Sequence, residues 1–525
     1  MPRFKLDGKE IPFEKGDTII TAAARAGIEI PHYCWHEALS IAANCRMCLV
    51  EIKTDRPPLM LPILRWDEKT QRYEPTTKPK LLPACQTPPA ENMEVFLDSD
   101  NVRQAQAAVQ EFMLANHPVD CPICDQAGEC KLQDYYEKHL GKLKRMRSEI
   151  THKPKAQRFG PTIIYDAERC INCTRCVRFC DEIAGDHVLD ERERGGLTEI
   201  VLSPGRQLDH RYTLMTAHLC PVGALTPIHN RFQCRAWMLR TAISICPGCA
   251  TGCNCFIDYD PRSGRVFRLR PRKNMAVNKF WMCDDGMMSY RKFGAERYKT
   301  GIVRNGKSDK SPPNEVVKTA ASALGKVEAA KLAVLLSATS PSEDNLLLVK
   351  LAAELGSEQL YLSARPDWEA DSILRNADNN PNRAGAVAAA GKQLATAEQL
   401  LQDVSDGKLS ALLALGGAED ADADLSALKK LSTIVCLASN KGPLSEVANL
   451  VIPVACHAEM DGTFVNARGV AQRFTRAIPP PDGIKPAWET LVDLAAAMGK
   501  QLGFTGLQEV RKAMPSAAAS EGSQA

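Results

Sequence analysis

The chain has 525 residues, of which 44% are hydrophobic and 25% charged, and its formal net charge is +3. This composition is ordinary for a globular protein, and the length predicts three or four domains. The N-terminus lacks the apolar core of a signal peptide, and no run reaches the roughly 18 apolar residues of a membrane span. The sequence therefore predicts a cytoplasmic or matrix-type chain without direct membrane insertion.

Residues 1–97 predict a small domain that begins with a hairpin. Asp7-Gly8 separates two short strand-like runs, and Asp-Gly is a preferred two-residue turn. A helix is expected over residues 18–25, closed by Gly27. The order of strand, turn, strand, helix and cysteine-bearing loop is that of a β-grasp ferredoxin.

The first candidate ligand set begins in that loop. Three cysteines lie close together and the fourth follows an insertion of about residues 55–80: Cys34, Cys45, Cys48 and Cys85. The ten-residue gap departs from the four-residue gap of plant-type ferredoxins, which indicates another lineage. Four thiolates suit a 2Fe-2S cluster, and a structural zinc ion is the alternative.

Residues 98–160 predict an amphipathic helix that leads into a second set. Apolar residues recur at helical spacing over residues 98–115. One face is expected to carry Val102, Ala105, Val109, Phe112 and Met113. Pro118 stops the helix, and a basic linker covers about residues 138–160.

His117 is the candidate that completes this second set. Only three cysteines follow it before Cys170, so the local set is one ligand short without the histidine: Cys121, Cys124 and Cys130. A neutral imidazole in place of a thiolate keeps a 4Fe-4S site complete and lowers its negative charge by one. A structural histidine is the alternative.

Residues 161–240 predict a ferredoxin-like domain, in which residues 162–165 form a strand before a loop similar to the bacterial run C-x2-C-x2-C-x3-C-P. The proline follows Cys220, whereas Cys180 precedes Asp181. The simplest 4Fe-4S assignment uses Cys170, Cys173, Cys176 and Cys220. Cys180 and Cys234 are then packing thiols, and a second cluster in this region is the alternative.

Residues 241–297 predict a further 4Fe-4S domain. Its ligands are expected to be Cys246, Cys249, Cys253 and Cys283. Cys255 competes with Cys253 for the third position, although the spacing favours Cys253. Residues 255–271 alternate around a turn and predict a β-hairpin that carries the chain toward the fourth ligand.

Residues 298–525 predict a doubly wound α/β domain. The expected strands cover residues 332–336, 411–415, 433–436 and 449–453, with a helix over 343–355. No G-x-G-x-x-G follows a strand, and Gly416-Gly417 precedes an acidic run over 418–424 that would repel phosphate. NAD and FMN are therefore expected on another polypeptide, no catalytic residue is expected here, and the tail over 515–525 reads as disordered.

The cysteines as a whole predict one 2Fe-2S and three 4Fe-4S clusters. Of the 20 cysteines, 18 fall between Cys34 and Cys283. Thiols at such spacing in a non-secreted protein bind metals more often than they form disulfides. Cluster charges of roughly −7 in total would bring the loaded chain to roughly −4, which argues against nucleic acid as a partner. A chain with several one-electron centres is expected to conduct electrons.

With its four sets in this order, the chain resembles the large iron-sulfur subunit (the G subunit) of bacterial NADH:quinone oxidoreductase, respiratory complex I, closely over residues 1–297. The resemblance implies the same four ligand sets, the last as an off-path cluster. It implies electron transfer from an NADH/FMN-binding subunit toward quinone. The implied partners are that NADH/FMN-binding protein, a small 2Fe-2S subunit and quinone-module subunits, on the cytoplasmic side of the bacterial inner membrane within a membrane-bound complex.

The C-terminal part is similar to the molybdopterin oxidoreductase fold, notably over residues 449–453 and 461–466 leading to Gln472. It is shorter than in molybdoenzymes, so no molybdopterin is expected. One alternative is the catalytic subunit of an NAD-linked formate dehydrogenase, with Cys456-His457 at its metal. Another is an adaptor subunit of an NAD-linked hydrogenase.

Overall fold

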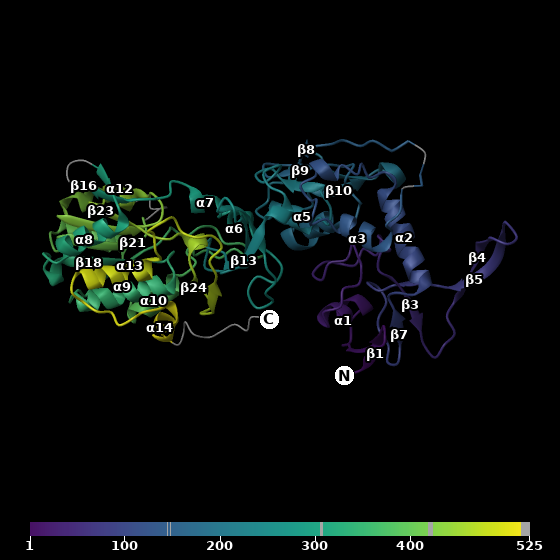
Figure 1. Cartoon of the computed structure of the whole chain (residues 1–525), viewed down its shortest axis with the longest axis horizontal. Helices are drawn as coiled ribbons and strands as arrows, with labels where there is room; N and C mark the ends of the chain where they lie inside the picture. Colours follow the sequence, from purple (N-terminus) through teal and green to yellow (C-terminus); the bar gives the residue numbers. More distant parts are fainter. Residues whose placement is uncertain (144, 147–148, 305–307, 418–423, 516–525) are drawn as a thin grey trace. The chain divides into compact units, whose positions relative to one another are not determined.

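The computed structural model describes residues 1–143, 145–146, 149–304, 308–417 and 424–515. The chain divides into two compact units, Met1–Trp237 and Met238–Ala525. Figure 1 labels their helices and strands. The acidic run predicted over 418–424 lies outside the described residues except for Asp424, and so does the predicted tail except for Pro515.

The first unit opens with a five-stranded sheet of order β2-β1-β7-β3-β6. Its elements are β1 (Arg3–Leu6), β2 (Lys9–Pro12), α1 (Ile19–Arg25), β3 (Leu49–Lys53), β6 (Leu82–Pro83) and β7 (Glu94–Phe96). Asp7 and Gly8 both have positive φ, as the tight turn between β1 and β2 requires. Thr18 caps α1, whose apolar face packs on the sheet. The predicted hairpin and helix are both present.

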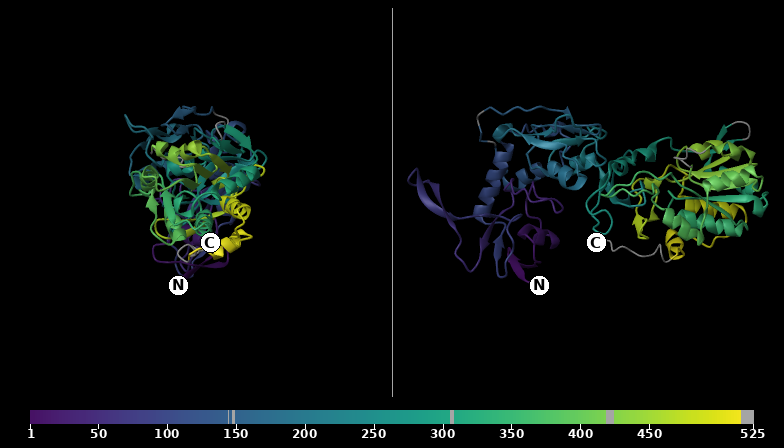
Figure 2. Two further views of the ribbon diagram at one scale, coloured as in Figure 1. Left: turned by 90° about the vertical axis from the view of Figure 1, so that its left-hand side faces the viewer. Right: turned by 180° about the vertical axis from the view of Figure 1, so that it is seen from behind.

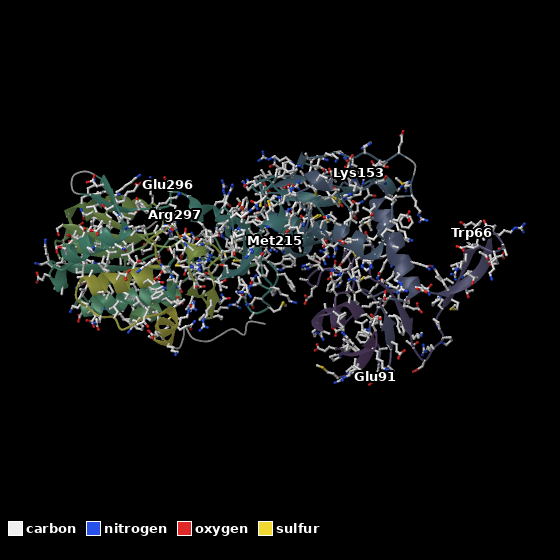
Figure 3. All side chains as sticks on the ribbon, in the orientation of Figure 1. Trp66, Glu91, Lys153, Met215, Glu296 and Arg297 are labelled. Carbon is white, nitrogen blue, oxygen red and sulfur yellow. The ribbon has the colours of Figure 1, made fainter. Side chains whose placement is uncertain are left out.

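The insertion between Cys48 and Cys85 forms a separate two-stranded ribbon, β4 (Met60–Asp67) and β5 (Arg72–Pro79). It stands out from the rest of the first unit in Figure 1 and in the right-hand view of Figure 2. Trp66 lies on the ribbon (Figure 3) and meets Tyr73 edge to face. The sequence had indicated an insertion here but no strands.

Helix α2 (Asp100–Ala115) confirms the predicted helix but not its face. Its buried residues are Val102, Gln106 and Gln110, whereas Phe112 is 79% exposed. The prediction assigned burial from hydropathy alone. Two glutamines occupy the inner face, and the side-chain amide of Gln110 donates a hydrogen bond to the Tyr33 hydroxyl.

The rest of the first unit consists of short elements around loops. They are α3 (Lys131–His139), β8 (Gln157–Arg158), β9 (Ile163–Tyr165), α4 (Arg175–Phe179), β10 (Leu189–Arg192), β11 (Glu199–Leu202), α5 (Thr213–Leu219) and β12 (Leu225–Pro227). Strands β12, β9 and β8 make a three-stranded sheet, with β9 at the strand predicted over 162–165. This sheet carries the chain into the loop that ends in α4.

The second unit begins with an antiparallel sheet of β13 (Arg240–Ile245), β14 (Asn254–Asp260) and β15 (Arg265–Pro271), followed by α6 (Asp284–Met288) and α7 (Arg291–Gly294). Strands β14 and β15 are the predicted hairpin. Its turn lies at residues 261–264.

An eight-stranded sheet of order β17-β16-β23-β22-β21-β18-β19-β20 forms the centre of the second unit. Its strands are β16 (Gly301–Arg304), β17 (Ser308–Ser311), β18 (Leu332–Ser337), β19 (Gln359–Ser363), β20 (Ala395–Thr396), β21 (Ala411–Leu415), β22 (Thr433–Ala438) and β23 (Leu450–Pro453). The six strands from β23 to β20 are parallel. One apolar core lies on each face, as in a doubly wound fold.

Helices and a small hairpin complete this unit. They are α8 (Pro313–Leu324), α9 (Ser342–Glu354), α10 (Arg383–Ala390), α11 (Ala397–Ser405), α12 (Pro443–Val447), β24 (Gly462–Val465), β25 (Ala471–Phe474), α13 (Ala487–Ala497) and α14 (Leu507–Lys512). Within the described residues, no helix combines the length and apolar character that a bilayer crossing requires.

Candidate metal centres

The first set brings four buried thiols together beside the five-stranded sheet. The side chains of Cys34 and Cys45 share a hydrogen bond, and so do the side chains of Cys48 and Cys85. The hydrogen bond from Cys45 lowers the pKa of Cys34 to about 5, and the bond from Cys48 lowers the pKa of Cys85. The two pairs also act on each other electrostatically, so the four sulfurs form one group.

The second set lies between α2 and α3. Cys121 and Cys124 flank a single helical turn, and Cys130 is the residue before α3. Burial, together with the charges of Cys124 and Cys121, raises the pKa of Cys130 to about 11. These three cysteines are therefore neighbours, as their spacing predicts.

His117 follows α2, and its imidazole ring takes part in a hydrogen bond. Its Nδ1 accepts a hydrogen bond of 3.1 Å from the backbone N–H of Val119. A neutral imidazole that accepts at Nδ1 carries its proton on Nε2. Iron binding at His117 would therefore require this bond to break or the Nε2 proton to leave.

The third set is formed by the loop before α4 and by the residue that ends α5. Burial raises the pKa of Cys170 to about 12 and of Cys173 to about 11, and the charge of Cys220 raises both. The backbone N–H of Asn172 donates to Cys170 Sγ at 3.4 Å. Such donors stabilise thiolate ligands.

The fourth set belongs to the second unit. Cys246, Cys249 and Cys253 lie between β13 and β14, and Cys283 precedes α6. All four are buried. Backbone N–H groups donate to sulfur here too, from Gly248 to Cys246 at 3.3 Å and from Gly286 to Cys283 at 3.4 Å.

Two sulfurs of the fourth set lie close to Gly286. A Cβ at this glycine would lie 3.0 Å from Cys246 Sγ and 3.5 Å from Cys283 Sγ. Cys255, the competing ligand, is part of β14 and its thiol interacts with Ser244 across the sheet. The choice between Cys253 and Cys255 stays a prediction.

The three sets of the first unit adjoin one another. The charge of Cys130 acts on Cys220, which links the second and third sets. A Cβ at Gly223, three residues after Cys220, would lie only 2.2 Å from Cys124 Sγ. Burial raises the pKa of Tyr33, and the charges of Cys130 and Cys45 raise it further, so this side chain lies between the first and second sets.

The donor chemistry of these sets fits iron-sulfur clusters. Every candidate cysteine ligand is a free thiol, soft donors are the ligands that such clusters take, and backbone N–H groups point at sulfur in the third and fourth sets. Within the described residues, no three His, Cys, Asp or Glu side chains are grouped as a site for a single metal ion. The assignment of the 16 ligands stays a prediction.

The remaining cysteines have other surroundings. Cys180 Sγ lies 3.5 Å from His210 Nε2, and the Cys234 thiol donates to the carbonyl of Arg235 at 3.6 Å. Cys456 is buried beside Glu459, and burial raises its pKa to about 12. The His457 ring packs against Phe464 and Phe474, and burial lowers its pKa to about 3.

A cavity of about 490 Å³ lies at the carboxyl ends of the parallel strands. It is lined by residues that include Gly248, Asp344, Arg365, Gly416, Cys456 and His457. Open α/β sheets bind ligands at such edges. The cavity adjoins the loop of the fourth ligand set, because Gly248 belongs to both.

Several residues of these sites were not indicated by the sequence reasoning. Tyr33, Gln110, Arg175 and Gly223 all contact or adjoin a ligand set. Arg175 could have been recognised from the sequence, because it is a cation that lies in the chain between two candidate ligands, Cys173 and Cys176. The others are brought to the sites by tertiary contacts between distant segments, which spacing alone does not predict.

Models of four protein families match the chain. They are described as 2Fe-2S iron-sulfur cluster binding domain (residues 2–100), NADH-ubiquinone oxidoreductase-G iron-sulfur binding region (106–140), NADH-quinone oxidoreductase subunit 3, ferredoxin-like domain (160–226) and Molybdopterin oxidoreductase (314–497). The first three ranges contain the first three ligand sets, and the fourth set lies between the last two ranges. Domains that bind 2Fe-2S and 4Fe-4S clusters and a molybdopterin oxidoreductase domain are therefore present.

Two curated relatives agree with these models. The G subunit of NADH-quinone oxidoreductase from Rickettsia conorii is 35% identical over 376 residues, 71% of this chain and 52% of the relative. Subunit 3 of Thermus thermophilus NADH-quinone oxidoreductase is 35% identical over 383 residues, 70% of this chain and 48% of the relative. The chain is a homologue of the G subunit of NADH-quinone oxidoreductase.

The resemblance to this large iron-sulfur subunit, expected from the motifs, is thereby confirmed. The chain spans about half the length of the curated relatives it matches. A solved structure titled as an NAD+-reducing [NiFe]-hydrogenase in the H2-reduced state is 26% identical and covers 44% of this chain and 90% of its own, with a TM-score of 0.37.

Proposed function

We propose that this chain is an electron-transfer subunit of an NADH:quinone oxidoreductase, and that it passes electrons from an NADH/FMN-binding subunit toward quinone. The observation that carries the proposal is the contiguity of three ligand sets in one unit, where Cys220 adjoins Cys130 and Tyr33 lies between Cys45 and Cys130. Redox centres in series need this arrangement, whereas isolated structural metals do not.

The cofactors proposed are one 2Fe-2S cluster on the first set and one 4Fe-4S cluster on each of the other three. When bound, the clusters supply one-electron oxidation and reduction. The fourth is proposed to lie off the main path. No molybdopterin is proposed for the shortened α/β part, although the 490 Å³ cavity lies where an open sheet would take a ligand.

The protein's own contribution is to bind, shield and bias these centres. The cysteines of the first and fourth sets are buried, which keeps water from the sulfurs. Backbone N–H groups donate to Cys170, Cys246 and Cys283 and favour the reduced, more negative state of a centre. Gln110 fixes the Tyr33 hydroxyl between the first two sets.

The proposed domains are a β-grasp 2Fe-2S domain (1–97), three small 4Fe-4S domains (98–160, 161–240 and 241–297) and the α/β domain from 298. The proposed partners are the NADH/FMN-binding subunit, a small 2Fe-2S subunit and quinone-module subunits. Assembly with them would place the chain at the cytoplasmic side of the bacterial inner membrane without its own insertion.

The metal content of the purified chain tests this proposal. We expect about 14 irons per chain with matching sulfide, no stoichiometric zinc or molybdenum, and one 2Fe-2S and three 4Fe-4S signals in electron paramagnetic resonance (EPR) spectra on stepwise reduction. Zinc in the four sets would contradict electron transfer. Stoichiometric molybdenum would favour a formate dehydrogenase.

A further inference from the structure

Arg175 lies between two ligands of the third set and reaches the first set. It is 6% exposed and begins α4, between Cys173 and Cys176. Its guanidinium donates to the carbonyl of Trp35 at 2.6 Å and to the carbonyl of Leu219 at 3.3 Å. These acceptors are the chain neighbours of Cys34 and Cys220, so one side chain is tied to both sets.

No carboxylate compensates this cation within the described residues. Arg175 forms no ion pair there, and its Nε is buried without a hydrogen-bond partner. Arg169 is similarly buried, at 4% exposed, and also lies near a candidate cysteine, but it does have carboxylate partners. Arg169 pairs with Asp120 at 2.7 Å and with Asp166 at 3.4 Å.

A buried charge without a counter-charge strongly disfavours folding. Burial lowers the pKa of Arg175, while the charges of Cys173, Cys220 and Cys34 raise it. Arginine nevertheless keeps its proton in proteins. The nearest compensating anions are therefore thiolates of the first and third sets, which become permanently anionic when they hold clusters.

We propose that Arg175 is a counter-charge shared by the centres of the first and third sets, and that it makes both easier to reduce. The inference rests on the proposed function, since it requires clusters in both sets. Reduction adds one electron to a centre and breaks no bond to the protein, and Arg175 keeps its proton. Its fixed positive charge favours the added negative charge in a buried region where solvent screens weakly.

The test is a redox titration of the iron-loaded full chain with dithionite as reductant, followed by EPR. Arg175→Gln should lower the equilibrium constant for reduction of the first and third centres at least tenfold, which is 59 mV for a one-electron couple. The second centre should shift less than threefold. Arg175→Lys keeps the charge, and both constants should stay within threefold of the parent.

Arg178→Gln is the matched control. Arg178 is three residues further along the chain and donates to the carbonyls of Cys34 at 2.5 Å and Cys173 at 3.2 Å, but it is only half-buried. Because solvent screens its charge, its substitution should shift the same two centres less than Arg175→Gln does. Equal shifts would contradict a special role for the buried cation.

Unchanged constants in Arg175→Gln, or a shift confined to one of the two centres, would overturn the proposal. If that variant does not retain iron, Arg175→Lys decides, because a tenfold shift despite its retained charge would assign the effect to the lost hydrogen bonds. Absence of cluster signals from the unsubstituted chain would contradict the proposed function itself. Normal signals with unshifted potentials would contradict only the role of Arg175.

Discussion

The ring of His117, a proposed ligand, accepts a hydrogen bond at Nδ1. The Val119 N–H occupies Nδ1, and both residues lie on the short segment between α2 and Cys121. This segment contains Pro118, and Val119 has a φ of 52°. A left-handed valine is strained, and the strain is compatible with a segment that changes when the site is filled.

Substitution of His117 tests the assignment directly. In His117→Ala, we expect the EPR signal of the second centre to be lost or strongly altered, because one of its four ligands is gone, while the other three signals persist. Iron analysis would show a loss of up to about four irons per chain. His187→Ala, at an exposed side chain, should change neither readout. Four unchanged signals in His117→Ala would show that the histidine is structural.

Gly223 offers a second single-residue test. A methyl group there would lie 2.2 Å from Cys124 Sγ, far inside contact distance. Gly223→Ala should therefore displace Cys124, destabilise the first unit by about 1–3 kcal/mol and weaken the second centre's EPR signal. Gly294→Ala, where a Cβ meets nothing within 4 Å, is the control. An unperturbed second signal would show that the loop after Cys220 can move aside.

At the scale of elements, the first turn of α9 is buried although it carries two acids, Glu343 and Asp344. Glu343 pairs with Arg511 at 2.9 Å and accepts from Thr463. Among the described residues, Asp344 accepts a hydrogen bond only from the backbone N–H of Trp488, at 2.9 Å. Burial and, to a lesser extent, the charge of Glu343 raise the pKa of Asp344 to about 8.

This raised pKa predicts how stability depends on pH. Between the ordinary pKa of 3.8 and about 8, the folded chain keeps a proton on Asp344 that the unfolded chain has lost, so stability falls as pH rises. Asp344→Asn should remove this loss, worth about 1.4 kcal/mol per pH unit. Thermal midpoints at pH 5 and pH 8 would measure it, with the exposed Asp493→Asn as control. Equal pH dependence in Asp344→Asn and the parent would contradict a neutral Asp344.

The sequence predicted elements well where the signal was local. Asp7-Gly8 specified the first hairpin, Thr18 and Gly27 bracketed α1, and short apolar runs marked β18, β21, β22 and β23. The sequence-based prediction was wrong where contacts between distant segments determine which residues are buried. The inner face of α2 holds Gln106 and Gln110, of which Gln110 donates to the Tyr33 hydroxyl, and Phe112 is left exposed.

The β4–β5 ribbon was missed because its apolar residues are exposed rather than buried against a core. Met60, Leu64 and Trp66 alternate along β4 and share one side with Tyr73 of β5. Hydropathy alternation usually marks a half-buried strand within a larger sheet. Here two strands pair only with each other.

Removal of the ribbon should leave the iron sites intact. The backbone N–H of Lys80 donates to the carbonyl of Leu59 at 2.8 Å, so a short Gly-Ser linker can replace residues 60–79. An isolated two-stranded ribbon contributes little stability of its own. We expect unchanged EPR signals and iron content in the shortened chain. Loss of the 2Fe-2S signal would show that the ribbon holds Cys85 in place.

At the scale of the whole molecule, the proposed iron ligands divide between two compact units, three sets in the first and one in the second. A chain of residues 1–237 should therefore fold alone and hold about 10 irons with three EPR signals. A purified 1–237 chain that lacks one of these signals would show that the second unit is needed to complete a site.

The ligand spacing predicts which cysteines form a set, and this grouping stays a prediction; it does not indicate how the sets adjoin. Cys130 and Cys220 are 90 residues apart and Tyr33 and Gln110 are 77 apart, yet each pair interacts. Contacts of such separation depend on how α2, α4 and α5 pack, which no local motif records. Neighbouring sets, and the arginine between two of them, could be recognised only in three dimensions.

The closeness of Gly223 to the Cys124 sulfur has a consequence for biogenesis. Because the segment that follows Cys220 lies against Cys124, we expect the filling of the proposed second and third centres to be coupled. We expect delivery of inorganic sulfide and iron to precede this contact, in a fixed order during synthesis.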